Sequence, residues 1–150
     1  MDWVQQAKQL FNLPKPEHFN NYRHCCECAE HDETLCHYDV DSIGLEQLGY
    51  PSWDPLCGVT PEGLKYYFPA MVRLTLESID HPDFFYGDQL LFHLIWDGNQ
   101  NRCFLACTPE QRAFITRFVE YLINTHAEAF DYGMSADQLL QAHDIWSEAI

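Results

Sequence analysis

Residues 108–123 read TPEQRAFITRFVEYLI and carry the clearest structural signal in the chain. They open with a capping box, in which the side chains of Thr108 and Gln111 satisfy free N–H groups at a helix start, and Pro109 suits the first helical position. Two adjacent rows of apolar residues follow at helical spacing. These rows are Phe114, Phe118 and Leu122, and Ile115, Val119 and Ile123. A stripe this broad predicts a helix packed deep in a core.

Five further segments carry helix signals of the same kind: residues 2–11, 42–48, 60–76, 88–95 and 135–146. Asp2 and Thr60 are suited to cap their helices, and the last segment opens with the capping box Ser135-x-x-Gln138. Pro69 lies inside the segment 60–76 and predicts a kink or a split near Lys65. The last helix is expected to bury Leu139, Leu140, His143 and Trp146.

The fold class that follows is mainly α: a single-domain helical bundle of about five helices over residues 1–150. A chain of 150 residues with 47% hydrophobic residues fits one core, and no repeat or linker divides it. Residues 17–59 show little periodicity and predict a long irregular N-terminal segment. The short apolar stretch RCFLACT at 102–108 predicts either a minor β element or an extended connector.

The charge of the chain excludes some classes of partner. It carries 23 acidic and 8 basic residues, a formal net charge of -15. A nucleic-acid binder needs a cationic surface, and anionic membranes repel an acidic protein, so neither is expected as a partner. The acidity indicates either an ordinary solvated surface or a surface that attracts a basic protein. No apolar run approaches the length of a membrane span, and the start resembles no signal peptide, so a cytoplasmic location is expected.

The strongest chemical signal is the stretch HCCECAEHDETLCH at residues 24–37. Cys25 and Cys28 have the C-x-x-C spacing that lets two thiolates reach one ion, and zinc accepts sulfur and imidazole ligands in a tetrahedron. The remaining ligands would come from His31 and Cys36, with His24 and His37 as alternatives. The competing interpretation is that the thiols pack under the segment while the histidines and acids face water.

The number of ligands would decide the role of such a metal. Four protein ligands predict a structural site, whereas three ligands and a water predict hydrolytic chemistry with Glu27, Glu30 or Asp32 as the base. Redox chemistry of the cysteine pair is disfavoured, because the neighbouring carboxylates are expected to raise the pKa of both thiols. The chain has seven cysteines, an odd number, and they are expected to stay reduced.

For the other candidate functional residues, the sequence favours structural roles. His93, His126 and His143 fit hydrogen-bonded boundary positions, and Cys103 with Cys107 fits packing better than metal binding. Trp53 is expected to anchor a turn at Trp53-Asp54-Pro55, and its functional alternative is a partner-binding aromatic side chain.

Several stretches resemble an uncharacterised bacterial family of unknown function, and together they span nearly the whole chain. They are HCCECAEHDETL (24–35), LGYPSWDP (48–55), TPEGLKYYFPAMVRLTL (60–76), QLLFHL (89–94) and TPEQR (108–112). The resemblance implies that His24, Cys25, Cys28 and His31 are the metal ligands, because Cys36 and His37 are peculiar to this chain. It implies a bacterial, cytosolic setting and no particular activity.

Two functional hypotheses follow. The first is a non-enzymatic protein-interaction or regulatory module, of an immunity or inhibitor type, that binds a basic protein and carries a structural zinc site. The second is a metal-dependent hydrolase that uses the segment 24–37.

Overall fold

The computed structural model describes residues 2–148, which form eight α-helices and four short 3-10 helices and contain no β-strand. The α-helices are α1 (Trp3–Leu10), α2 (Cys26–His37), α3 (Leu45–Leu48), α4 (Pro61–Glu77), α5 (Gly87–Ile95), α6 (Arg102–Ala106), α7 (Pro109–Tyr132) and α8 (Ala136–Ser147). The 3-10 helices are η1 (Pro51–Trp53), η2 (Pro55–Gly58), η3 (Pro82–Phe84) and η4 (Gly98–Gln100). The prediction of a mainly helical protein is confirmed, although residues 2–148 form eight α-helices where about five were expected.

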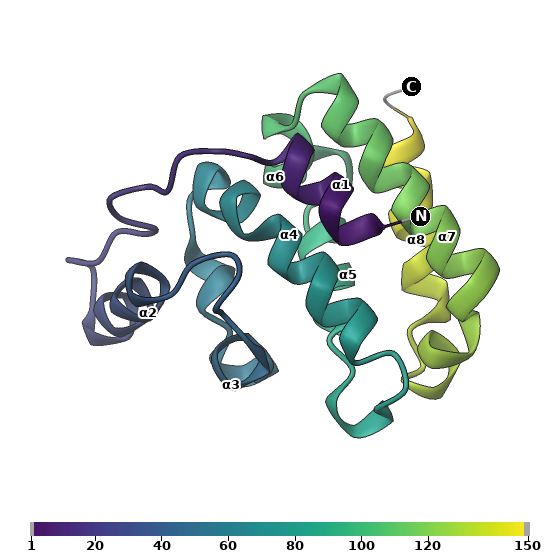
Figure 1. Cartoon of the computed structure of the whole chain (residues 1–150), viewed down its shortest axis with the longest axis horizontal. Coiled ribbons are helices and arrows are strands. Elements are labelled where there is room, and N and C mark those ends of the chain that lie inside the picture. The colour runs from purple at the N-terminus through teal and green to yellow at the C-terminus, as the bar shows by residue number, and fades with distance from the viewer. Residues whose placement is uncertain (1, 149–150) are drawn as a thin grey trace.

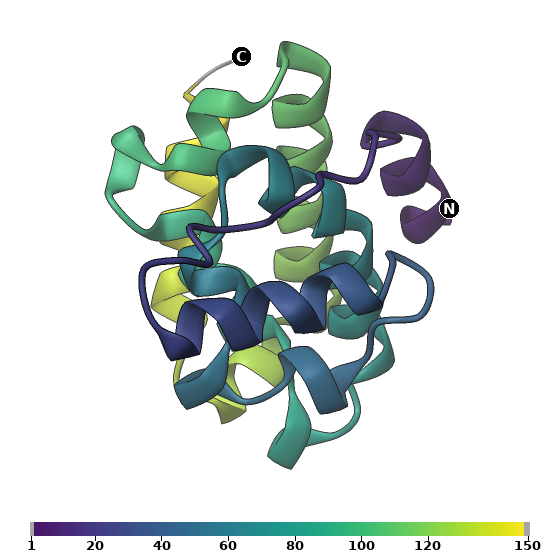
Figure 2. The same cartoon turned by 90° about the vertical axis from the view of Figure 1, so that its left-hand side faces the viewer.

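One hydrophobic cluster joins the helices. Helix α7 packs along α8, α1 packs on α4, and α5 lies against α8. Figure 1 shows α4 and α5 in the middle of the molecule, with α7 and α8 at one end and α2 and α3 at the other. Figure 2 shows α2 lying across the face that it covers. The N-terminal segment thus forms one side of the bundle, and residues 51–58 lie beneath the start of α2.

Of the two predicted capping boxes, the one at Thr108 forms and the one at Ser135 does not. Thr108 and Gln111 form both bonds of the predicted box at the start of α7, and that helix continues past the predicted stripe to Tyr132, with a non-helical residue at His126. At the start of α8, Ser135 makes no capping bond, because its hydroxyl is bonded to the Asp88 carboxylate of α5. In α8, Leu139 and Trp146 are buried as expected. Leu140 is exposed and His143 is only half-buried, because both lie on the outward side of α8.

Three other expectations differ from the structure, one of them only in part. Of the kink or split predicted near Lys65, the split is wrong, because helix α4 continues through Pro69, which is buried in the core. Residues 102–106 form helix α6, capped by the Asn101 side chain, and not a strand or an extended connector. Residues 26–37 of the predicted irregular segment form α2, and only Asp32 and Leu35 of that helix are buried. Because α2 is so exposed, its sequence carries almost no apolar periodicity.

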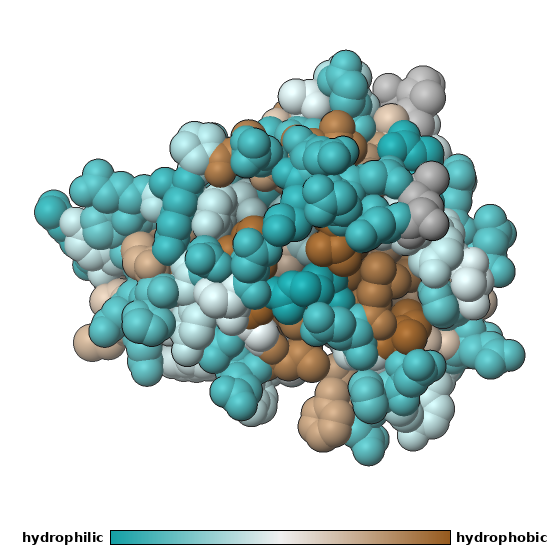
Figure 3. Space-filling view, in the orientation of Figure 1, coloured by the Kyte–Doolittle hydropathy of each residue, from teal (hydrophilic) through white to brown (hydrophobic). Residues whose placement is uncertain are grey.

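The surface of the molecule is largely polar on the face shown in Figure 3, where hydrophobic residues occur in separate patches. Several large apolar side chains are nevertheless exposed: Tyr50, Trp53, Phe84, Phe92, Trp96, Leu105, Tyr132, Met134 and Leu140. Within residues 2–148, none of the helices combines the length and the apolar character needed to cross a bilayer.

Candidate metal centre

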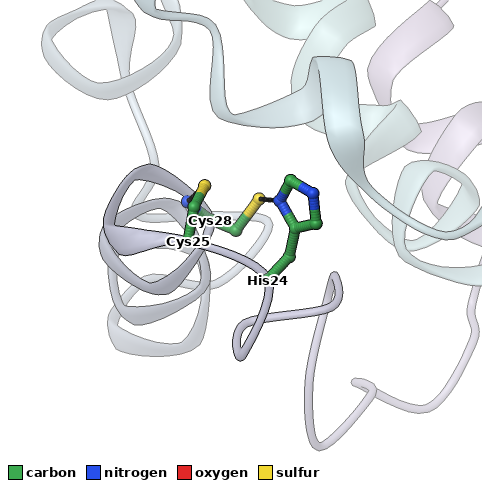
Figure 4. A group of neighbouring side chains, drawn as sticks. All are labelled: His24, Cys25 and Cys28. Carbon is green, nitrogen blue, oxygen red and sulfur yellow. Dashed lines mark hydrogen bonds between the residues drawn. The ribbon is translucent and has the colours of Figure 1, made fainter.

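The start of helix α2 positions the C-x-x-C pair. Cys25 is the N-cap: its backbone is extended, and its sulfur accepts a hydrogen bond from the backbone N–H of Cys28 at 3.4 Å. This bond satisfies one of the free N–H groups at the helix start, a task usually done by Ser, Thr, Asp or Asn. Cys28 lies in the first turn of α2, so both sulfurs are at the same end of the helix (Figure 4).

His24 completes a group of three donors. One donor atom from each of His24, Cys25 and Cys28 lies within 4.8 Å of the other two, and the Cys28 sulfur is 3.7 Å from His24 Nδ1. Figure 4 shows the imidazole turned toward Cys28. Ligands of a tetrahedral zinc ion with ordinary bond lengths lie about 3.3–3.8 Å apart. Small rotamer changes would therefore bring these donors onto one ion.

The two thiols of this group differ in acidity. Hydrogen bonds from the Cys28 backbone and from His24 lower the pKa of Cys25 to about 7. The pKa of Cys28 is raised, first by its interaction with Cys25 and then by burial. The expectation that the carboxylates raise the pKa of both thiols is therefore wrong for Cys25, because N–H groups at a helix start stabilise a thiolate directly.

His31 does not belong to this group of three donors. It is on the next turn of α2, where its ring lies 4.6 Å from the Trp53 ring and its Nε2 is 4.0 Å from a carboxylate oxygen of Glu27. Its Nδ1 is buried and has no hydrogen-bond partner in the described part of the chain. His31 therefore packs between α2 and residues 51–58.

The two alternative ligands also lie elsewhere. Cys36 is near the other end of α2, where its sulfur is 3.4 Å from the Glu17 backbone oxygen, in a second donor group with His18 and Asp32. His37 packs edge-on against Tyr38, with ring centroids 4.9 Å apart. A helix of this length separates its two ends by about 1.5 Å per residue, so neither residue can join the donors at Cys25.

The carboxylates near the site have distinct roles. Asp32 is buried and accepts hydrogen bonds from the Phe19 backbone N–H and from His18 Nδ1, both at 2.7 Å, so it ties α2 to the preceding chain. Glu27 lines a cavity of about 300 Å³ together with Cys28 and His31. Glu27 is thus placed to act on a molecule bound beside Cys28, and Asp32 is not.

Residues 51–58 form the other wall of this cavity. Trp53 is at the end of η1 and remains 42% exposed, so the indole is both a packing partner of His31 and an accessible surface. The buried carboxylate of Asp54 accepts a hydrogen bond from His93 of α5, which is the kind of role predicted for that histidine. Cys57 lies close to Asp54 and His93 and forms a donor group with them. Nothing in the local sequence pattern indicates that these three residues meet.

The remaining candidates are structural. His126 contacts the Tyr121 hydroxyl, and His143 contacts Glu120. Cys103 and Cys107 are buried with their sulfurs 4.0 Å apart.

The chain matches no family model, no curated protein and no solved structure. The resemblance to a bacterial family therefore stays a prediction.

Proposed function

We propose that this protein is a zinc-binding module that works by interaction with another protein. The observation that carries the proposal is the convergence of His24, Cys25 and Cys28 at the start of α2. These are two sulfur donors and one imidazole, the set that zinc prefers, and the pKa of the Cys25 thiol is already lowered to about 7.

A zinc ion in this position would fasten the chain before α2 to the first turn of the helix. Only two residues of α2 are buried, so the helix has little hydrophobic packing to hold its start in place. A metal bound by donors on both sides of the helix start supplies that constraint. The three donors leave a fourth coordination position, which a water, a fourth side chain after a local movement or a partner residue would fill.

The partner proposed here is a basic protein, as expected for an inhibitor-like or immunity-like module. The formal charge of -15 favours rapid association with a positively charged surface. The exposed Trp53 beside the cavity is a suitable apolar anchor for such a contact. The cysteines of the chain are all free, which supports a reducing, cytoplasmic setting.

Elemental analysis of the untagged protein tests the metal. The double variant Cys25→Ala, Cys28→Ala should lose one equivalent of zinc. Cys26→Ala is the matched control, because Cys26 is exposed, as Cys25 is, and belongs to none of the donor groups found among residues 2–148. Equal zinc contents in the double variant and the wild type would refute the site.

Affinity capture from the native host tests the partner. A basic protein should be recovered at low salt and lost as the salt concentration rises, because screening weakens surface electrostatics. Recovery of no protein at low salt would count against an interaction role.

One observation favours a second candidate, a metal-dependent hydrolase. The cavity of about 300 Å³ adjoins Cys28 and is lined by Glu27, so a substrate could approach both an open metal position and a general base. X-ray absorption of the zinc protein separates the two candidates. A shell of two sulfurs, one nitrogen and one water oxygen is required for the hydrolase, and four protein ligands exclude it.

A further inference from the structure

A second group of donors lies at the junction of η2 and α5. Asp54, Cys57 and His93 each offer one donor atom, and the three atoms lie within 4.8 Å of one another. They supply a carboxylate oxygen, a sulfur and an imidazole nitrogen from segments 39 residues apart in the chain. The group shares no residue with the cluster at the start of α2.

Hydrogen bonds hold two of these donors in place. Asp54 Oδ1 accepts the backbone N–H of Leu56 at 2.9 Å, which fixes the carboxylate at the start of η2. Asp54 Oδ2 accepts from Gln89 at 3.2 Å and from His93 Nε2 at 2.8 Å. Gln89 also donates to the Leu48 backbone oxygen. These side chains are therefore held in position by the fold, and a bound ion would replace the hydrogen bond between His93 Nε2 and Asp54 Oδ2, with the imidazole proton left on Nδ1.

The burial of the group suits a cation. The side chains of Asp54 and His93 are each 3% exposed, and a carboxylate so far from water is stabilised by hydrogen bonds, which Leu56, Gln89 and His93 supply, and by positive charge. A zinc ion bound by carboxylate, thiolate and imidazole would supply that charge. Helix α5 contributes Gln89 one turn before His93, so one face of α5 supplies a ligand and a residue that orients the Asp54 carboxylate.

Cys57 gives the group access to solvent. It is exposed and lines three cavities, of about 320, 300 and 210 Å³. The nearby guanidinium of Arg102 donates to the backbone oxygens of Leu56, Cys57 and Val59, so it fixes the backbone of η2. An ion can therefore reach the sulfur from outside, and a small ligand can reach the ion.

A nucleophilic role for Cys57 fits the surroundings less well. Although Cys57 is exposed, the protein around it removes part of the water from its sulfur, and this partial desolvation, together with the charge of Asp54, raises the pKa of the thiol to about 11. The thiol is then protonated at neutral pH, whereas a catalytic cysteine needs a stabilised thiolate. A bound metal ion would displace this proton directly.

We infer that Asp54, Cys57 and His93 form a second zinc site, which opens on the same cavity of about 300 Å³ that Cys28 lines. This site is independent of the one at the start of α2. With both occupied, the cavity would have a metal centre on each of two walls, one from α2 and one from η2 and α5.

Cobalt titration of the full-length, metal-free protein tests the inference, with sulfur-to-cobalt charge transfer as the readout. The wild type should bind two equivalents, and the double variant Cys25→Ala, Cys28→Ala should bind one. Adding Cys57→Ala to the double variant should abolish the remaining binding and its absorption band. Adding Cys26→Ala instead should leave both unchanged.

Two results would overturn the second site: a double variant that binds no cobalt, or residual binding and absorption that survive Cys57→Ala. If the double variant binds as much cobalt as the wild type and Cys57→Ala alone removes one equivalent, the second site stands and the first fails. Because Cys57 is exposed, its replacement should leave the fold intact, as circular dichroism would verify. His93→Gln, which retains a hydrogen-bond donor for Asp54, should likewise lose one equivalent.

Discussion

His93 Nε2 lies 2.8 Å from Asp54 Oδ2, and both side chains are buried, each 3% exposed. This contact joins α5 to residues 51–58. Asp54 also caps η2 through Leu56, so one carboxylate fixes both the backbone of the segment and its attachment to the bundle.

Removal of this carboxylate should be strongly destabilising. In metal-free protein, Asp54→Ala should lower the free energy of unfolding by about 3 kcal/mol, because it leaves His93 and Gln89 buried without their partner. Urea denaturation measures the loss. Asp83→Ala, at an exposed aspartate, should change the free energy by no more than about 0.5 kcal/mol. Equal losses for the two variants would contradict the role given to Asp54.

Replacement of Arg102 by lysine should lower the stability of the protein. Its guanidinium donates to the backbone oxygens of Leu56, Cys57 and Val59, and a lysine cannot reach three acceptors in this geometry. Arg102→Lys should therefore cost about 1–2 kcal/mol and should speed amide hydrogen exchange in residues 56–59. Arg117→Lys, at an exposed arginine, is the matched control and should do neither.

Two buried tyrosines should respond oppositely to loss of the hydroxyl. The Tyr67 hydroxyl is within hydrogen-bond distance of the backbone oxygens of Leu35 and Tyr38 at the end of α2, so Tyr67→Phe should cost about 1–2 kcal/mol. The Tyr86 hydroxyl is buried with no partner among residues 2–148, so Tyr86→Phe should cost nothing or stabilise slightly. Thermal and urea unfolding of both variants check the pair, and a larger loss at Tyr86 would reverse the assignment.

Cys25 should be the more reactive thiol of its pair in metal-free protein. Its pKa is lowered to about 7, so the thiolate is present above this pH and disappears as the pH falls through it, whereas the pKa of Cys28 is raised. Alkylation by iodoacetamide, followed by mass spectrometry, should therefore modify Cys25 at lower pH than Cys28. Added zinc should protect both sulfurs. Earlier modification of Cys28 would show that the helix start does not stabilise the Cys25 thiolate.

Local sequence patterns were sufficient to predict a helix where that helix has both a capping residue and a buried apolar stripe. The start of α7 is the clearest case, because the Thr108 and Gln111 side chains act within one turn and need no tertiary contact. The C-x-x-C pair is also local: four consecutive positions place Cys25 and Cys28 at one helix end. The neighbouring His24 joins them for the same reason.

Helix α2 was not predicted because hydrophobic periodicity appears only in a helix that buries one face, and α2 buries only Asp32 and Leu35. Likewise, α6 is too short for its period to distinguish helix from strand. Helix α4 passes through Pro69 because surrounding core contacts outweigh the loss of one backbone hydrogen bond.

The sequence by itself determined a helical, acidic protein and the cluster of sulfur and imidazole donors before and within α2. The geometry of helix α2 separates Cys36 and His37 from the pair at Cys25. Only the tertiary structure places His31 against Trp53 and brings Asp54 and Cys57 to His93. The physical reason is the distance along the chain over which each kind of interaction acts. Caps and helix periodicity act over a few residues, whereas contacts between segments 39 residues apart depend on how the whole core packs.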